Sequence, residues 1–365
     1  MAEPFKLLVD RAAVSRLAAA ILRVYPAFDA PGFVAKAADG LDPLELKARV
    51  QHVARALRAA LPADWARAAA ILVASLPPAL PDESGLSGGI ALWPLLQVVE
   101  DYGRDLPEVS LPALKEMTRR FSAEFAIRPF LVEHPTLTGR TLDTWVTDPD
   151  VHVRRLVSEG TRPRLPWGGV LRAAIADPTP GLERIARLVD DPSPYVRRSV
   201  ANHLGDVAKD HPALAVAVAA RWMAEDPSRR PLVLHALRTP LKRGDPAALA
   251  LLGYAPGSIR VTELALDRDE VTEGDVLTVS ARIGVDAPAT VRVDVVWTWP
   301  GARGRGRRVF NAGSRDLAPG ETWAFRHRLH TRPVTTRRPA EGTHTLVLRV
   351  QGQDQPPLPF TFRRG

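Results

Sequence analysis

The sequence predicts a helical-repeat domain followed by an immunoglobulin-like β-sandwich. Two segments, Asp148–Gly160 and Asp191–His203, begin 43 residues apart, and each opens with Asp-Pro and carries an Arg-Arg pair among apolar positions spaced as on a helix. A period of about 40 residues built from paired helices is typical of HEAT-type α-solenoids. Beyond residue 257 the apolar residues alternate instead, which indicates strands.

Helical spacing extends from Phe5 to about Tyr254. Leu46, Val50 and Val53 begin one apolar stripe, and similar stripes recur along the segment. Asp or Ser followed by Pro repeatedly starts a new stretch, and this order suits a helix N-cap and first turn. These pairs are Asp42-Pro43, Asp148-Pro149, Asp177-Pro178, Ser193-Pro194, Asp226-Pro227 and Asp245-Pro246. We expect about fourteen short helices, forming a HEAT-like repeat domain over residues 1–256.

The pattern changes near Ala255–Gly257. In the segment that follows, alternate residues share one strand face, as in Val291, Val293, Val295, Trp297 and Trp299, with Arg292, Asp294 and Thr298 opposite. About seven short strands are expected in residues 257–365, which favours an immunoglobulin-like β-sandwich. The cysteine pair common in such domains is missing, so the likeness concerns architecture alone. A small β-barrel is the alternative.

The chain is basic, with a formal net charge of +8, and 43 of its 49 basic residues are Arg. Ten of them lie between Arg303 and Arg338, against the acids Asp316 and Glu321. Such a field attracts nucleic acid or another anionic surface, although a solvated basic face is the simpler alternative.

The absence of Cys excludes disulfides, thiolate metal sites and thiol catalysis. No secretory signal is visible, and the longest apolar run, at residues 68–76, is about half of what a bilayer requires. We therefore expect a soluble cytoplasmic protein without a membrane partner.

Three acids stand out because each has a polar neighbour one helical turn away. Glu124 precedes Arg128 by four residues on an expected helix, Glu159 follows Arg155 by four, and Asp206 follows His203 by three. Each pair could simply be a solvated ion pair or polar pair on the helix surface, and HEAT repeats also use Asp and Arg to join one repeat to the next. However, stacked repeats align equivalent helices along one concave surface, so Glu159 and Asp206 can lie on adjacent helices.

Two further features suit a nucleic-acid ligand. Trp167 lies in a loop between Arg164 and two glycines, where its indole could stack on a flat cationic base, although core packing is equally compatible. The turn Gly301–Arg308 carries four Arg that could enter a DNA minor groove, or could form a disordered basic hairpin. Zincin spacing, a nucleophile elbow and a Gly-rich phosphate loop are absent, so neither a metal nor an organic cofactor is expected.

The segments Phe121–Leu131, Val153–Trp167 and Pro194–Pro212 resemble the HEAT-like-repeat DNA alkylation repair glycosylases, specifically their AlkC-type branch. The C-terminal immunoglobulin-like domain also fits that branch. The resemblance implies excision of 3-methyladenine and 3-methylcytosine from duplex DNA, with Glu124, Glu159 and Asp206 as the active-site acids. It further implies that Trp167 and the Arg pairs contact base or backbone. We expect base contacts from Trp167, Arg155 and Tyr195, and DNA contacts from Arg128, Arg154, Arg162, Arg164, Arg197, Arg198, His203, Arg303, Arg305, Arg307 and Arg308. Nothing in the sequence demands more than a monomer, and we expect one.

The chemistry agrees with this implication. A base methylated at N3 is already cationic and leaves without a strong general acid, while carboxylates near C1′ stabilise the sugar cation and orient water. Lys209 is the lysine nearest the acids in sequence, so a Schiff-base lyase step is not expected. The alternative is a non-catalytic HEAT-repeat scaffold that binds nucleic acid or a protein partner.

Overall fold

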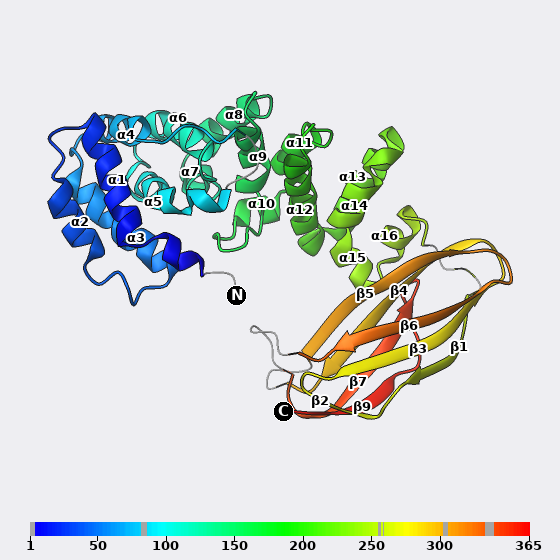
Figure 1. Cartoon of the computed structure of the whole chain (residues 1–365). Coiled ribbons are helices and arrows are strands. Elements are labelled where there is room, and N and C mark those ends of the chain that lie inside the picture. The colour runs from blue at the N-terminus through cyan, green and yellow to red at the C-terminus, as the bar shows by residue number, and fades with distance from the viewer. Residues whose placement is uncertain (1–3, 82–85, 255–256, 258, 302–305, 333–338) are drawn as a thin grey trace. The chain divides into compact units, whose positions relative to one another are not determined.

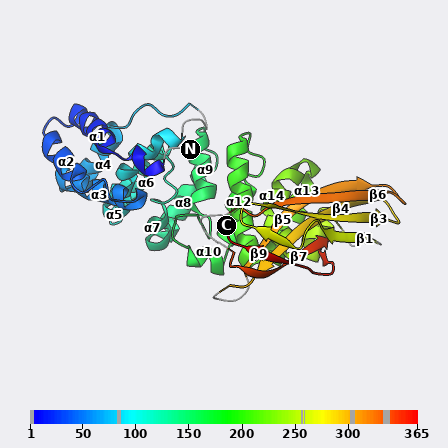
Figure 2. The ribbon, with the colours of Figure 1, turned by 60° about the horizontal axis from the view of Figure 1, so that its bottom comes forward.

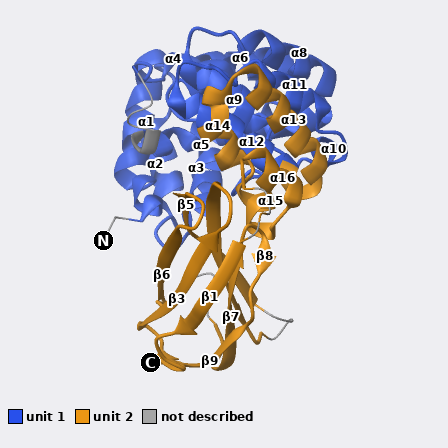
Figure 3. Ribbon diagram, turned by 90° about the vertical axis from the view of Figure 1, so that its right-hand side faces the viewer, with its two compact units in different colours: residues 1–207 blue, residues 208–365 orange. Residues whose placement is uncertain are grey.

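The computed structural model describes residues 4–81, 86–254, 257, 259–301, 306–332 and 339–365, in which sixteen α-helices precede nine strands (Figure 1). The helices end at Leu251 and the strands begin at Ile259, on either side of the boundary predicted at residue 256. The chain nevertheless divides into compact units at another place, with residues 1–207 in unit 1 and residues 208–365 in unit 2 (Figure 3). The last helices thus belong to the same compact unit as the strands.

Unit 1 consists of short helices that follow one another approximately in sequence order (Figures 1 and 2). Several helices begin at an Asp that accepts hydrogen bonds from amides of the first turn, as Asp10, Asp64 and Asp150 do. Helix α9 thus starts after Asp150, two residues beyond the predicted Asp148. The helices are α1 (Arg11–Val24), α2 (Ala30–Ala38), α3 (Leu46–Ala60), α4 (Trp65–Ala74), α5 (Trp93–Tyr102), α6 (Pro107–Thr118), α7 (Arg128–Glu133), α8 (Pro135–Trp145), α9 (Val151–Gly160), α10 (Arg172–Ala176), α11 (Thr179–Ala186) and most of α12 (Pro194–Asp210).

Ion pairs between Asp and Arg join successive repeats. Arg119 Nε lies 2.9 Å from Asp150 Oδ2, and Arg154 Nε lies 2.6 Å from Asp191 Oδ2. Arg154 also donates to two carbonyls at the start of its own repeat, and Arg197 does the same 43 residues later. The first Arg of each Arg-Arg pair therefore braces the start of its own repeat, and Arg154 also joins its repeat to the next one.

Unit 2 contains α13 (Pro212–Glu225), α14 (Arg230–Ala236), α15 (Arg238–Arg243), α16 (Pro246–Leu251) and two sheets. One sheet has the order β1-β3-β6 and the other β2-β9-β7-β4-β5, with β8 paired to β7. Neighbours are antiparallel except β2 and β9. The strands are β1 (Ile259–Leu266), β2 (Glu270–Thr272), β3 (Val276–Val285), β4 (Ala289–Trp299), β5 (Gly306–Leu317), β6 (Thr322–His330), β7 (Gly342–Val350), β8 (Gln353–Asp354) and β9 (Leu358–Arg363). The predicted sandwich is confirmed.

Strand β4 shows why the last helices belong to unit 2. Its predicted apolar face is buried in the sandwich core, but Arg292 and Asp294 on the other face are buried as well. They form a two-point ion pair with distances of 2.9 and 2.8 Å, and the Arg292 guanidinium lies over the ring of Tyr254 at 5.7 Å. Arg349 on β7 donates to the carbonyl of Lys242 on α15. These contacts bury a polar strand face that alternation alone predicts to be solvated.

Within the described part of the chain, no helix combines the length and apolar character needed to cross a bilayer.

Candidate active site

The structure brings together the three predicted acids, all in unit 1. Glu124 lies in the turn before α7, Glu159 lies near the end of α9, and Asp206 lies on α12. Arg155 pairs with both Glu124 and Glu159, the latter at 3.5 Å. Arg162 joins Glu159, at 2.5 Å, to Asp206, at 2.8 Å. Glu124, Arg155, Glu159, Arg162 and Asp206 thus form one continuous acid–arginine network.

The expected helical pair between Glu124 and Arg128 is wrong. Helix α7 begins only at Arg128, and Pro129, which has no amide hydrogen, suits its first turn. Glu124 therefore lies in the preceding turn and pairs with Arg155 on α9 instead. Gly160 ends α9 tightly against this turn, since a Cβ there would lie 2.7 Å from Ile127 Cγ2. Close packing of the two segments positions Glu124 beside α9.

The network is largely withdrawn from water. Asp206 is fully buried and Glu159 is 5% exposed, whereas the side chains of Glu124 and Arg155 each keep 15% exposure. Burial acts to raise the pKa of Glu159, but the guanidinium groups of Arg155 and Arg162 outweigh it, so this pKa lies below its ordinary value. Glu159 is therefore an anion at neutral pH.

Serine hydroxyls complete the hydrogen bonding of two of the acids. Ser199 donates to Glu159 Oε2 at 2.6 Å and itself accepts from Ser158 at 2.6 Å. Ser122 donates to Glu124 Oε2 at 2.8 Å. None of these serines was predicted from the sequence, although Ser122 lies only two positions before Glu124. The hydroxyls hold the carboxylates in fixed orientations.

His203 lies beneath the network and is 1% exposed. Its Nδ1 is 2.9 Å from the carbonyl of Ser158, to which it donates. Burial lowers the pKa of His203 to about 4, so the ring is neutral at physiological pH. A neutral, enclosed ring does not support the predicted contact between His203 and DNA.

Arg128 is likewise enclosed, at 5% exposure. Its Nη1 donates to the carbonyls of Gly160 and Arg162 at 2.9 and 2.8 Å, and its Nη2 donates to the carbonyl of Gly169. Burial, followed by repulsion from Arg162, lowers the pKa of Arg128 to about 10. These contacts make Arg128 a support of the segment from Gly160 to Gly169.

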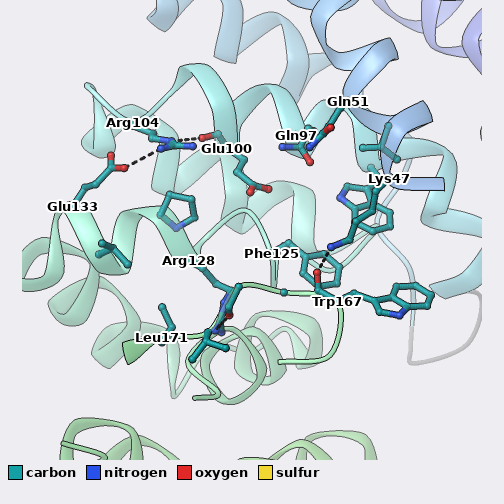
Figure 4. A pocket seen from close by; sticks show the side chains of 17 residues that line it. Lys47, Gln51, Gln97, Glu100, Arg104, Phe125, Arg128, Glu133, Trp167 and Leu171 are labelled. Carbon is teal, nitrogen blue, oxygen red and sulfur yellow. Dashed lines mark hydrogen bonds and ion pairs between the residues drawn. The ribbon is translucent and has the colours of Figure 1, made fainter. Parts of the chain in front are cut away.

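That segment contains Trp167, which is 60% exposed. Its carbonyl accepts a hydrogen bond from Lys47 on α3 (Figure 4). A cavity of about 360 Å³ lies beside it, lined among others by Lys47, Trp93, Glu100, Phe125, Arg128 and Trp167. The three acids are not among its lining residues. Arg128, rather than Trp167 itself, links this loop to the acid–arginine network.

The remaining predicted contacts differ in their accessibility. The ring of Tyr195 lies 5.1 Å from the guanidinium of Arg155, beside the network. Arg198 and Arg307 are exposed, whereas Arg164 is half-buried in a bridge with Val170. Arg308 lies over the indoles of Trp297 and Trp299 at 5.9 and 5.6 Å. Arg303 and Arg305 lie outside the described residues.

In the described ranges, no three His, Asp or Glu side chains are grouped so that they could hold a metal ion.

Comparison with known proteins gives concordant matches. Residues 260–364 match the family described as the C-terminal immunoglobulin-like domain of the uncharacterised protein YhaZ. YhaZ of Bacillus subtilis is 37% identical over 319 residues, which is 87% of each chain. A structure of Pseudomonas fluorescens alkylpurine DNA glycosylase AlkC, bound to DNA containing an abasic site analogue, is 34% identical with a TM-score of 0.90 and covers 99% of this chain and 100% of that one. The chain therefore belongs to the family of YhaZ and the alkylpurine DNA glycosylase AlkC.

Proposed function

We propose that this protein is a DNA glycosylase that removes cationic N3-methylated bases, 3-methyladenine and 3-methylcytosine, from duplex DNA. Its similarity to AlkC extends over 99% of the chain. The observation that carries the proposal is the acid–arginine network, in which three carboxylates from separate repeats share two guanidinium groups. Because one chain supplies every member of the network, we propose that it acts as a monomer.

The network suits a reaction whose leaving group needs little help. A base methylated at N3 carries a positive charge and departs as a neutral molecule, so positive charge accumulates on the sugar. Carboxylates that are already ionised and oriented stabilise that charge without reorganising. Glu159, kept anionic by Arg155 and Arg162, is suited to this task. A carboxylate of the network also orients or deprotonates the water that attacks C1′.

We propose that water, rather than a lysine, is the nucleophile. Lys209 is the lysine nearest the three acids in sequence. In the structure, Lys47 Nζ lies 5.9 Å from the ring of Phe125, the residue that follows Glu124. This amine donates to the carbonyl of Trp167. Borohydride reduction during turnover is expected to trap no covalent DNA adduct. A trapped adduct that disappears in Lys47→Met would show a Schiff-base lyase instead.

The accessible residues are the best candidates for DNA contacts. We propose that Trp167, Tyr195 and Arg155 face the lesion, and that the exposed Arg198 and Arg307 meet phosphates together with Arg164, Arg303 and Arg305. Burial or contacts to carbonyls favour supporting roles for the other predicted DNA-binding residues, namely Arg128, Arg154, Arg162, Arg197 and His203. Arg308 packs on two indoles, so both a phosphate contact and a supporting role are open to it.

The test uses the full chain and duplex DNA treated with a methylating agent. Mass spectrometry of the small-molecule fraction is expected to show free 3-methyladenine and 3-methylcytosine. The alternative, a non-catalytic scaffold, predicts tight binding of the same DNA with no base above the spontaneous background. Catalytic release would exclude the scaffold, and binding without release would exclude the glycosylase.

A further inference from the structure

Trp167 combines two unusual properties. Its backbone φ of 64° lies in the left-handed region, which costs a residue with a Cβ about 1–2 kcal/mol. Its large apolar side chain nevertheless remains 60% exposed. Strain of this kind persists only where surrounding contacts enforce it, and such positions cluster at sites that meet a ligand. The loop therefore holds an exposed indole in a fixed position at a cost in conformational free energy.

The first enforcing contact comes from Lys47. Its Nζ donates to the carbonyl of Trp167, 120 residues away in sequence, and lies 5.9 Å from the ring of Phe125. Phe125 in turn stacks on Trp93, with ring centroids 5.0 Å apart and planes inclined by 16°. Figure 4 shows the lysine extending between Phe125 and the loop. Since Phe125 directly follows Glu124, Lys47 ties the indole to the segment that carries the first acid.

The second contact comes from Arg128 on the other side of the loop. Its donors reach the carbonyls of Gly160 and Arg162, which flank the end of α9, and the carbonyl of Gly169, two residues beyond Trp167. Arg162 is itself a member of the acid–arginine network. Arg128 thus ties the loop to the second and third acids.

We propose that Lys47 and Arg128 form a two-point clamp that fixes Trp167 relative to the three acids, and that Lys47 is a positioning residue for base excision. This inference rests on the proposed function. Its physical basis is that a displacement of about 1 Å between a substrate-contacting group and the catalytic groups costs up to about a hundredfold in rate. Lys47 is the better test residue, since it is more exposed than Arg128 and its loss leaves no buried carbonyl cluster unpaired.

The structural half of the test needs no activity. The full chain contains eight Trp, so labelling with 5-fluorotryptophan gives a small set of ¹⁹F resonances, and Trp167→Phe assigns one of them. In Lys47→Met, the Trp167 resonance is expected to shift or broaden more than the others. Lys47→Arg, which retains a donor, is expected to restore it. An unchanged Trp167 resonance in Lys47→Met would overturn the clamp, whatever the protein's activity.

The kinetic half uses single-turnover release of 3-methyladenine. Lys47→Met is expected to lower the rate constant at saturating enzyme about tenfold or more, with a smaller change in DNA affinity. In the Trp167→Ala background the same change is expected to have no further effect, because the clamp has nothing left to position. Effects that multiply instead would overturn the inference. Lys36→Met, which removes an exposed lysine of α2, is the control for lost charge. If the wild type released no base, the proposed function would fail while the ¹⁹F comparison still tested the clamp.

Discussion

Replacing Glu159 by Gln perturbs the centre of the acid–arginine network while conserving side-chain size. The carboxylate accepts from Arg162 at 2.5 Å and from Ser199 at 2.6 Å, and it lies 3.5 Å from Arg155. The amide still offers one acceptor oxygen, but it carries no charge and directs hydrogens toward donors. Both guanidinium groups keep an acid, Glu124 or Asp206, so the network is weakened rather than dismantled.

The expected effect on catalysis exceeds the effect on folding. Loss of one preorganised group that stabilises transition-state charge lowers kcat about 10²–10³-fold, or about 3–4 kcal/mol. Hydrogen bonds to charged groups contribute about 1.5–3 kcal/mol, and the amide retains part of each, so the loss of folding free energy is about 2–3 kcal/mol. For a unit of this size that corresponds to a fall in Tm of about 5–10 °C. The variant therefore stays folded at assay temperature.

The assay measures single-turnover release of 3-methyladenine from methylated duplex, together with DNA affinity and Tm. Asp294→Asn is the matched control, because it weakens a buried pair of similar enclosure, Arg292–Asp294, in the sandwich of unit 2. The control is expected to lose stability but to retain excision. Wild-type excision in Glu159→Gln would refute a catalytic role for the network, as would equal losses of rate in the two variants.

Three further predictions concern pH, DNA contacts and the repeats. The pKa of Glu100 is raised to about 7, mainly by burial, so the stability that its protonated form contributes is lost as pH rises from 4.5 toward 7. The pKa of His203 is lowered to about 4, mainly by burial, so the stability that its neutral form contributes is lost as pH falls from 6.5 toward 4. In denaturant titrations, Glu100→Gln should therefore stabilise the protein at pH 8, and His203→Gln should flatten the acid limb, each by up to roughly 3 kcal/mol; parallel pH profiles would contradict this. Arg307→Ser should reduce the steepness of log affinity against log salt concentration by about 1, and an unchanged slope would show that Arg307 does not contact a phosphate. Asp191→Asn should lower Tm by breaking the pair with Arg154 but leave excision intact; an unchanged Tm would contradict the role of that pair.

The sequence predicted the parts of the site that depend on the repeat. Because equivalent helices stack at a spacing of 43 residues, Glu159 and Asp206 were expected on neighbouring helices, and Arg162 joins them in the structure. The alternation along β4 likewise predicted the sandwich core. Both patterns are periodic, and periodicity is what a single sequence shows most directly.

Contacts between distant segments could not be predicted in the same way. Glu124 was expected beside Arg128 on a helix, but tertiary packing gives it Arg155, 31 residues later. The hydrogen bond from Lys47 to Trp167 spans 120 residues and involves a backbone carbonyl, so neither residue type nor spacing indicates it. Arg128 was expected to contact DNA, yet its donors are taken up by carbonyls inside the protein. Residue type alone does not distinguish an Arg that contacts phosphate from one that supports a loop.

The dependence of rate on the charge of the departing base tests the central claim most directly. Matched duplexes carrying either 3-methyladenine, which is cationic in DNA, or its neutral 3-deaza analogue would be compared in single turnover, with wild type and Glu159→Gln. We predict rapid excision of the cationic base by the wild type, little excision of the neutral one, and a strong loss in the variant. Equal excision of both bases, or a variant as fast as the wild type, would show that fixed carboxylates beside the sugar do not drive the reaction.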